Sequence, residues 1–468
     1  MGEKVFEYDQ TLFEDGKVLL NSKESENISE YKSQIPWSRD EIAEAEAEIK
    51  RLRLDEKEED FILKIETCQH ETYLKSKQHV GVFYLGKRTI QVLPKMYKAG
   101  SGVSERQAKN NLIYMLGYIN KLDIKQHTIS SLLEQDLNFF EVLVRLFATN
   151  LLEQWRKGAF RCYQSVNDTL PVLKGKLNLT EQLRHPEQKH LFSVTYDEFT
   201  ADNQLNQILR HVVERLWKLT KNNKNKQLLN DLRQLMNEVT LLPSVNIPSI
   251  SRIPFTRLNL HYQPILKLAQ LFLMKKSFEL DTGKVEVFSF AFMFDMNVLF
   301  EKFVISFIER NRNEIFEDLE NCKSYPQADK IEKHMGIKTS NNKSNKNERV
   351  FKIKPDLVIE HDNSYPFIID TKYKKLKKDH QNLGVDEKDF YQMYAYAQCY
   401  NCPRVLLIYP QCEDTNEPLQ ATFKIQSNFE SGKRDRTIIA ATINLRGDLS
   451  KQDEKDKLLN RLKELFQY

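Results

Sequence analysis

The clearest pattern of apolar and polar positions lies in the middle of the chain, where it predicts amphipathic helices. Between Thr200 and Thr220, apolar residues recur every three or four positions, which places them on one helical face. Thr200 or Asp202 is the expected N-cap, because a short polar side chain there can accept a hydrogen bond from an unpaired backbone N–H group. Helical periodicity is expected over 107–221, and a second helix over 230–239. The apolar stripe consists of Leu205, Ile208, Leu209, Val212, Val213 and Leu216.

The last third begins with another helix and then alternates between strand and helix patterns. Apolar residues over 294–311 keep helical spacing. After a polar insert at 338–349, which is expected to be a loop, β-branched and aromatic runs alternate with one helical segment. This order predicts an α/β or α+β module. The strand-like runs are 351–360, 366–373 and 404–410, and the helical segment is 388–400.

The first hundred residues have the short alternating runs that are typical of β-structure. A surface helix is predicted over 39–54, and residues 79–94 predict a hairpin with a Gly-Lys turn. Because 468 residues exceed what one hydrophobic core usually supports, we expect an α+β or α/β multidomain protein. The predicted domains are an N-terminal β-rich domain at 1–104, a mainly helical middle domain at 105–285 and a C-terminal α/β domain at 286–468.

Composition and charge narrow the class of protein. With 40% hydrophobic and 29% charged residues, the chain has the composition of a globular protein. Its net charge of +4 is small for its length, so contact with nucleic acid requires a local basic patch. The first residues lack the apolar core of a signal peptide, no apolar run is long enough to span a bilayer, and six cysteines do not make a disulfide scaffold. A soluble, cytoplasmic protein is expected.

Two acids and a lysine gather in the segment KPDLVIEHDNSYPFIIDTKYKKL, residues 354–376. Asp356 opens one strand-like run and Asp370 lies near the end of the next, with the turn-rich HDNSYP between them. A hairpin would bring the two acids together. Asp370 and Lys372 are two positions apart, so they point to the same face of a strand. The segment therefore predicts two carboxylates and one ammonium in a shared site.

This combination suits metal-dependent hydrolysis of a phosphodiester bond. Two neighbouring carboxylates repel each other, and Mg²⁺, which prefers carboxylate, water and phosphate oxygens, would relieve that repulsion. Such an ion activates a water molecule and stabilises the developing charge, while Lys372 can hold the water. The basic run beside the acids is placed where a DNA backbone would need it. The expected DNA-binding residues are Lys374, Lys375, Lys377 and Lys378.

The plain alternative is a surface hairpin with a solvated basic tail. Against it, Asp370 follows the apolar run 366–369, where an acid without a partner is costly. Gln392 and Tyr396 lie four apart on one face of the predicted helix, and Glu301 lies next to an apolar stripe. For these helical residues, ordinary amphipathic decoration is an open alternative.

Taken in order, these residues resemble the PD-(D/E)xK nuclease superfamily in its QxxxY variety, over about 286–468. From about residue 75 onward, the chain also resembles the McrC family, the nuclease subunit of McrBC-type restriction systems, which act on modified (5-methylcytosine) DNA. Residues 1–70 and the insert match no pattern. The segments that carry the second resemblance are HVGVFYLGKRTIQVLPKM, LKGKLNLTEQL, YDEFTADNQLNQIL, FDMNVLFEKFV, KPDLVI, IIDTKYK, YQMYAYA and LLIYP.

The resemblance implies a restriction-endonuclease-like fold for the C-terminal domain and an endonuclease that cuts double-stranded DNA with Mg²⁺, in defence against phage and foreign DNA. It implies a partner, a hexameric McrB-like AAA+ GTPase that binds the GTP, recognises the modified DNA and is stimulated by the N-terminal part of this chain. By matching, the metal ligands would be Asp356, Asp370, Thr371 and Glu301, the catalytic lysine Lys372, and the supporting residues Gln392 and Tyr396.

Two further motifs offer possible cofactor sites. GVFYLGK at 81–87 fits the start of a phosphate-binding loop, but its middle residues are bulky and Arg88 replaces the required Ser or Thr, so GTP hydrolysis by this chain is not expected. Four cysteines flank the predicted site and could hold an iron–sulfur cluster, although the family resemblance favours ordinary packing. They are Cys322, Cys399, Cys402 and Cys412.

Three functions therefore stay open at this point. The first is a Mg²⁺-dependent endonuclease subunit that is active with its GTPase partner. The second is a regulator without catalytic activity that only bridges or stimulates the motor, and the third is a stand-alone RecB-like nuclease. The intact acids and Lys372 favour the first, because a regulator has no use for paired acids beside a lysine.

Overall fold

The structure is a computed structural model, and it divides the chain into two compact units. One unit contains residues 1–139 and 278–468, and the other contains residues 140–277. The residues described are 12–14, 17–20, 31–34, 39–51, 64–68, 71–76, 79–85, 88–94, 96, 102–119, 137–185, 187, 190–250, 252–273, 290–317, 319, 321–338, 348–412, 417–425 and 436–467.

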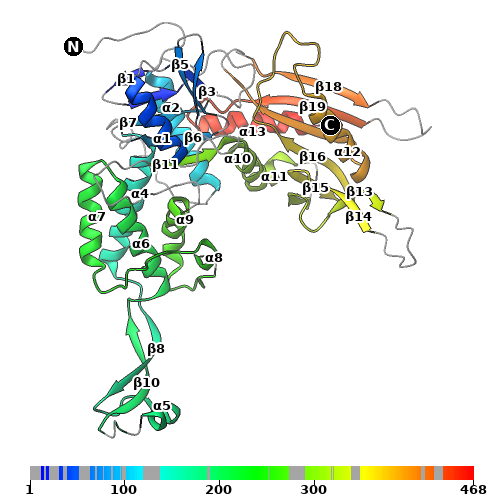
Figure 1. Cartoon of the computed structure of the whole chain (residues 1–468). Helices are drawn as coiled ribbons and strands as arrows, with labels where there is room; N and C mark the ends of the chain where they lie inside the picture. The colour runs from blue at the N-terminus through cyan, green and yellow to red at the C-terminus, as the bar shows by residue number, and fades with distance from the viewer. Residues whose placement is uncertain are drawn as a thin grey trace. The chain divides into compact units, whose positions relative to one another are not determined.

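The N-terminal part of the first unit holds a five-stranded sheet in the order β1-β2-β7-β6-β11 (Figure 1). The predicted hairpin at 79–94 is confirmed, since β6 and β7 pair in antiparallel register. A second sheet has the order β3-β5-β4, and the predicted surface helix is α1. The bounds are β1 Leu12–Glu14, β2 Lys17–Leu20, β3 Tyr31–Gln34, α1 Arg39–Arg51, β4 Lys64–Cys68, β5 Glu71–Ser76, β6 His79–Leu85, β7 Arg88–Val92 and β11 Phe290–Asp295.

Two elements join parts of this unit that are distant in the sequence. Strand β11 belongs to the N-terminal sheet, where it pairs antiparallel with β6. Helix α2 (Gly102–Ile119) carries Asn111, whose side-chain amide donates to the carbonyl oxygens of Leu445 (3.0 Å) and Gly447 (2.7 Å). These contacts cross the boundaries expected near residues 104 and 286, and the division into three domains stays a prediction.

The C-terminal part is a six-stranded mixed sheet in the order β12-β15-β16-β17-β19-β18. Strands β16, β17 and β19 are parallel, and helix α12 forms the crossover between β16 and β17. The alternation of strands and helices expected from the sequence is therefore confirmed, but the run 351–360, expected as one strand, is divided between β14 and β15, which belong to different sheets. The bounds are α10 Met296–Arg310, α11 Arg312–Ile315, β12 Lys323–Pro326, β13 Lys333–Lys338, β14 Glu348–Ile353, β15 Leu357–His361, β16 Ser364–Thr371, α12 Glu387–Tyr400, β17 Arg404–Pro410, β18 Gln420–Ile425, β19 Arg436–Ile443 and α13 Gln452–Phe466.

Both faces of this sheet are covered, as expected for strands that read as continuous apolar runs. On one face, Ile368, Val405 and Leu407 pack against Met393 and Tyr396 of α12. Side chains alternate along a strand, so the neighbouring Phe367 lies on the other face, where its ring is 5.8 Å from Phe316 and 5.2 Å from Phe466. The site described below lies at the end of β16, where Asp370 shares the α12 face of the strand with Ile368.

The second unit corrects the sequence analysis, which expected helical structure throughout 107–221. Helices α4, α6, α7 and α9 are present, but β8 and β10 form a long antiparallel ribbon with register Cys162↔Thr200 to Leu170↔Phe192. Alternating polar and β-branched or aromatic residues in CYQSVNDTL and FSVTYDEFT were the missed signal. The bounds are α4 Phe139–Lys157, β8 Cys162–Leu170, β9 Lys176–Leu177, α5 Leu179–Arg184, β10 Phe192–Thr200, α6 Gln204–Leu219, α7 Asn223–Leu235, α8 Ile247–Ile250, η1 Leu260–Tyr262 and α9 Gln263–Leu273.

The expected N-cap of α6 is also corrected. Asn203, rather than Thr200 or Asp202, caps the helix, and its side-chain oxygen accepts from the backbone N–H of Asn206 at 3.1 Å. Asp202 instead accepts from Thr240. All six residues of the predicted apolar stripe are buried, so the helix itself is confirmed.

Some expectations fall outside the described residues. They include the Gly-Lys turn at 86–87, most of residues 1–70 and positions 339–347 of the polar insert. Among the helices that the structure describes, none is both long and apolar enough to cross a membrane.

Candidate active site

The β15–β16 hairpin brings Asp356 to the end of β16, as the sequence predicted. Leu357 pairs with Ile369, so Asp356, one residue before β15, lies beside Asp370 and Thr371. Asp356 Oδ2 accepts hydrogen bonds from the backbone N–H and the hydroxyl of Thr371, at 2.8 and 2.9 Å. These two bonds fix the orientation of the Asp356 carboxylate.

A chain of polar contacts runs from Asp370 to α12. Lys372 Nζ lies 2.7 Å from Asp370 Oδ2, and it donates to Gln392 Oε1 at 3.2 Å. Gln392 Nε2 donates to the hydroxyl of Tyr396 at 2.6 Å, and that hydroxyl donates to the backbone carbonyl of Lys354 at 3.1 Å. Gln392 and Tyr396 therefore reach the predicted site from one helical face.

Burial raises the pKa of both acids. Asp370 is only 1% exposed, and burial together with the nearby Asp356 carboxylate raises its pKa to about 7, although Lys372 opposes the shift. Burial also raises the pKa of Asp356, against the hydrogen bonds from Thr371. Burial alone would lower the pKa of Lys372, but Asp370 outweighs it, so the pKa is raised and the ammonium stays charged.

Glu301 reaches the same region from α10. Its carboxylate accepts a hydrogen bond from the side-chain amide of Gln327, whose backbone N–H donates to the carbonyl of Asp356 at 2.7 Å. Burial first, and then the Asp356 charge, raise the pKa of Glu301. The helical position of Glu301 thus brings it within electrostatic reach of the predicted acids.

The four lysines of the basic run after β16 lie in different environments. Lys374 Nζ forms ion pairs with Asp389 Oδ2 at 2.8 Å and with Asp386 at 3.6 Å. Lys375 and Lys377 are half-buried, and Lys378 is exposed. A role of these four lysines in DNA binding stays a prediction.

Asp389 is a site residue that the sequence analysis missed. It is buried in the first turn of α12, three residues before Gln392, and its charge acts on both Asp370 and Lys372. An acid one turn before Gln392 on the same helical face was the available signal. The Lys374–Asp389 pair joins the segment that carries Lys372 to the helix that carries Gln392.

Comparison with known proteins identifies the family to which the chain belongs. A family model described as McrBC 5-methylcytosine restriction system component matches residues 74–410. This chain belongs to the McrBC family. The resemblance noted in the sequence is thereby confirmed, while a comparison with curated proteins gives no match.

Among solved structures, this McrBC-family chain matches one from Thermococcus gammatolerans described as a refined half-complex from a tetradecameric assembly of McrB AAA+ hexamers with bound McrC. The identity is 22%, the TM-score is 0.64, and the match covers 96% of this chain and 100% of the other, which shows a shared fold. A second match, to the cryo-EM structure of the T. gammatolerans McrBC complex, has 24% identity, a TM-score of 0.47 and coverage of 63% and 88%.

The donor set of the McrBC-family site suits a hard divalent cation. Asp356 and Asp370 offer carboxylate oxygens, and the raised pKa of Asp370 reflects, after burial, a repulsion that a cation would relieve. Within the described part of the chain, no three His, Cys, Asp or Glu side chains gather closely enough to enclose a metal. Mg²⁺ needs only one or two carboxylates, with water and phosphate oxygens completing its coordination.

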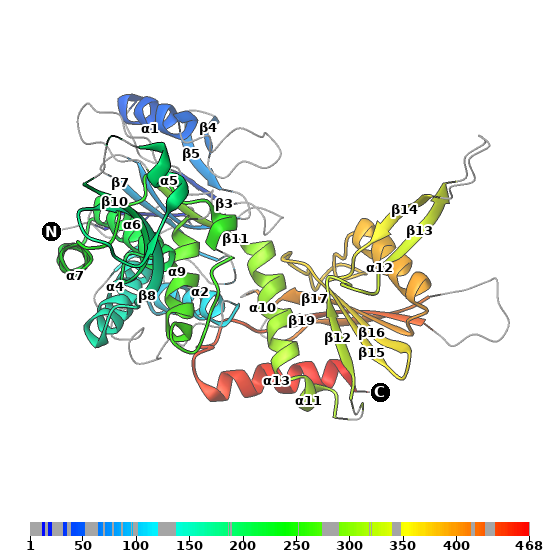
Figure 2. The same ribbon diagram turned by 90° about the horizontal axis from the view of Figure 1, so that it is seen from below.

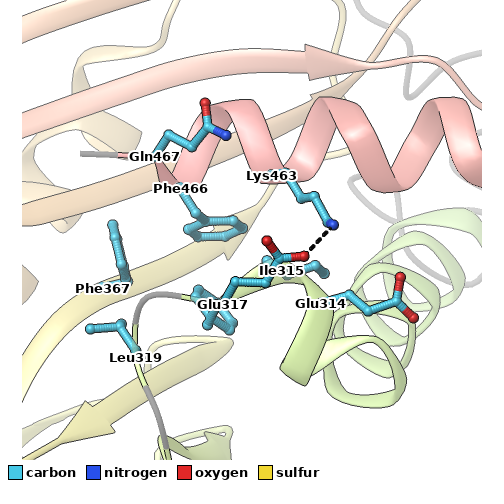
Figure 3. Close-up of a pocket in the computed structure, with 9 residues that line it drawn as sticks. Glu314, Ile315, Glu317, Leu319, Phe367, Lys463, Phe466 and Gln467 are labelled. Carbon is cyan, nitrogen blue, oxygen red and sulfur yellow. Dashed lines mark hydrogen bonds and ion pairs between the residues drawn. The ribbon is translucent and has the colours of Figure 1, made fainter.

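One pocket lies on the other face of the sheet and is separate from these acids. It has a volume of about 40 Å³ and is lined by Phe367, Phe466 and the ion pair between Lys463 Nζ and Glu317, 2.7 Å apart (Figure 3). Ligand pockets are commonly about 300 Å³ or larger, so this space is too small for a nucleotide.

Proposed function

We propose that this chain is the DNA endonuclease subunit of a McrBC-type restriction system and that it requires Mg²⁺. The observation that carries the proposal is the contact of Asp370 with Lys372, and of Lys372 with Gln392, beside the fixed carboxylate of Asp356. Two acids and a charged lysine at one strand end suit phosphodiester hydrolysis. A protein that acted only as a regulator would gain nothing from this costly arrangement.

In this proposal, Asp356 and Asp370 hold the metal, and Glu301 and Thr371 contribute from its periphery. The bound ion would lower the pKa of a water molecule and stabilise negative charge on the phosphate. Thr371 keeps Asp356 oriented through its N–H and hydroxyl groups. Lys372, which stays protonated, orients the attacking water and offsets charge on the phosphoryl oxygens.

Gln392 and Tyr396 support Lys372 in this scheme. The Gln392 side-chain oxygen accepts from the Lys372 ammonium, and Tyr396 accepts from the Gln392 amide. Because Tyr396 is 2% exposed and also bonded to the Lys354 backbone, it restricts the position of Gln392. The pair would hold Lys372 at the site while DNA enters.

The proposed partner is a hexameric McrB-like AAA+ GTPase. The matched T. gammatolerans assembly is described as McrB hexamers with bound McrC, and this chain shares its fold over nearly its whole length. GTP would be bound by the partner, and cleavage of double-stranded DNA would require both proteins. Such a complex would act in the cytoplasm against phage and other foreign DNA.

The deciding experiment separates cleavage from stimulation of the partner. With the cognate GTPase and GTP, Asp370→Ala should abolish cleavage of methylated DNA while stimulated GTP hydrolysis remains. The matched control is Asp379→Ala, which removes an exposed acid of the same domain. Persistent cleavage by Asp370→Ala would contradict the site, and cleavage by the wild type without partner or GTP would indicate a stand-alone nuclease. If the wild type cleaves DNA under none of these conditions, the chain would instead be a regulator without catalytic activity.

A further inference from the structure

The two-stranded sheet of β13 and β14 extends from the C-terminal module beside α12 (Figure 2). Its strands and the residue after them, 333–338 and 348–354, contain five lysine or arginine residues and one acid. Lys333, Arg349, Lys352 and Lys354 are exposed. Among ion pairs between residues that the structure describes, these four cations take part in one, between Lys352 and Glu332. The strands therefore present a positive surface.

Two apolar side chains lie exposed among these cations. Phe351 is 75% exposed and Met335 is 59% exposed. The Phe351 ring lies beside Gly336. A Cβ added to Gly336 would be 3.5 Å from a carbon of that ring, which is ordinary van der Waals contact. Lysines alone on a small sheet could simply prevent edge-to-edge aggregation, but an exposed phenyl ring beside them works against that purpose.

The backbone of Phe351 is also unusual. Its φ is +58°, a left-handed conformation that a bulky residue rarely adopts. Such strain is typically kept at functional sites, where the surrounding structure holds the residue in place. Here it accompanies a ring that is presented to solvent.

The base of this small sheet is fixed to the proposed active site. Tyr396 donates to the carbonyl of Lys354, and Tyr400 donates to the carbonyl of Ile331 at 3.1 Å. Ile353 belongs to the core that packs on α12. The chain then continues through Pro355 to Asp356, so the positive surface and the acids are parts of one continuous segment.

We infer that the β13–β14 sheet is a DNA-binding arm that holds the duplex at the active site. Lys333, Arg349 and Lys354 would pair with phosphates, and Phe351 would make apolar contact within a groove, as wedge residues of groove-binding proteins do. A purely protein-binding surface would not need cations on both sides of the apolar pair. The inference extends the proposed nuclease function and rests on it for the identity of the ligand.

The test uses the full chain carrying Asp370→Ala, so that bound DNA is not cut, and a fluorescent DNA duplex at a series of salt concentrations. Lys333→Glu/Arg349→Glu should weaken binding at least about tenfold and flatten the slope of log K against log salt by about 2, since each lost phosphate contact removes about 0.9. Phe351→Gly should weaken binding by roughly 5- to 10-fold at an unchanged slope, because the lost contact is uncharged. Glycine also tolerates the positive φ, so this variant should keep the fold.

The control is Lys457→Glu, at an exposed residue of α13, the helix that covers the face of the six-stranded sheet opposite to α12. This substitution should change neither the affinity for DNA nor its salt dependence. Unchanged affinity and slope in the Lys333/Arg349 variant would overturn the inference, as would an absence of DNA binding when the arm is intact. Loss of GTPase-partner binding with normal DNA binding would also overturn it and identify the arm as a protein-binding surface. Failure of the nuclease proposal is seen separately, in the cleavage assay.

Discussion

Asp370 shows how a single buried carboxylate can cost the folded protein stability and still suit a metal site. The side chain is almost fully buried, and burial and the Asp356 charge raise its pKa to about 7 even though Lys372 lies 2.7 Å away. The folded protein without a cation therefore resists ionisation of Asp370. A cation bound between the acids would compensate for this cost.

This environment predicts a pH dependence of stability. The folded pKa of Asp370 is about 7, whereas an unperturbed aspartate has a pKa of about 3.9. Because the folded state holds the proton more tightly, the free energy of unfolding should decrease as pH rises from about 4 to about 7. In chelator, Asp370→Asn should therefore melt several degrees above the wild type at pH 8 but not at pH 4, where both are neutral at this position.

Differential scanning calorimetry of the two proteins across this range makes the measurement. Asp379→Asn, at an exposed acid, should follow the wild-type curve. Parallel curves for Asp370→Asn and wild type would show that Asp370 ionises without cost. Addition of Mg²⁺ at pH 8 should stabilise the wild type more than Asp370→Asn, since the ion binds the charged carboxylate.

The Lys374–Asp389 ion pair gives a second prediction at this scale. Lys374→Met leaves the buried Asp389 without its closest charge partner, so it should lower both the melting temperature and kcat, with little change in KM for DNA. The double variant Lys374→Met/Asp389→Leu should recover the melting temperature but not kcat, because the segment that carries Lys372 loses its ion pair with α12. If Lys374 instead binds phosphate, the single variant would flatten the salt dependence of DNA binding and leave the melting temperature unchanged.

At the scale of elements, the pairing of β6 with β11 depends on the absence of a side chain at Gly81. Its φ is +146°, and a Cβ there would lie 2.1 Å from the carbonyl oxygen of Phe292 on β11. Gly81 lies opposite Met293 in this antiparallel pair. The glycine of the rejected phosphate-binding motif thus has a structural reason.

Gly81→Ala should therefore destabilise the chain by about 2 kcal/mol or more, because either the strands separate or the backbone leaves its preferred geometry. The expected observation is a lower melting temperature together with faster amide exchange in β6. Gly336→Ala is the matched control, since the nearest atoms to its added Cβ are 3.5 Å away and its φ is not positive. Equal effects of the two substitutions would argue against the β6–β11 pairing.

At the scale of the whole molecule, the described site residues all belong to the first unit, while the second unit exposes its own apolar side chains. Those at 163–199 include Tyr163, Leu179, Leu183 and Phe199, with exposures between 54% and 79%. The proposed catalytic site and these exposed apolar side chains therefore belong to different units of the chain.

Removal of the metal should test whether the proposed site also contributes to association with the partner. In the complex with the cognate GTPase, EDTA followed by Ca²⁺ in place of Mg²⁺ should stop DNA cleavage, because Ca²⁺ prefers more ligands and a looser geometry than two carboxylates impose. Binding of the chain to its partner, measured by size-exclusion chromatography with GTP analogue retained, should persist. If this chain, treated alone with chelator before mixing, no longer assembled with the GTPase, its metal site would have a structural role.

The sequence by itself determined much of the local structure. The apolar stripes of α6 and α10, the β6–β7 and β15–β16 hairpins and the order of elements from β15 to β17 follow from periodicity and turn residues, which act between near neighbours. The same reasoning placed Asp370 and Lys372 on one strand face, and Gln392 and Tyr396 on one helical face. These are relationships over two to four positions.

Only the tertiary structure decided the relationships between distant residues. It placed β11 in the N-terminal sheet, attached α2 to the C-terminal part through Asn111, and paired Lys374 with Asp389. It also chose Asn203 over its polar neighbours as the cap of α6, and paired β8 with β10 where helix was expected. Strand pairing and burial of charge depend on which segments meet, and a local pattern of apolar and polar residues does not contain that information.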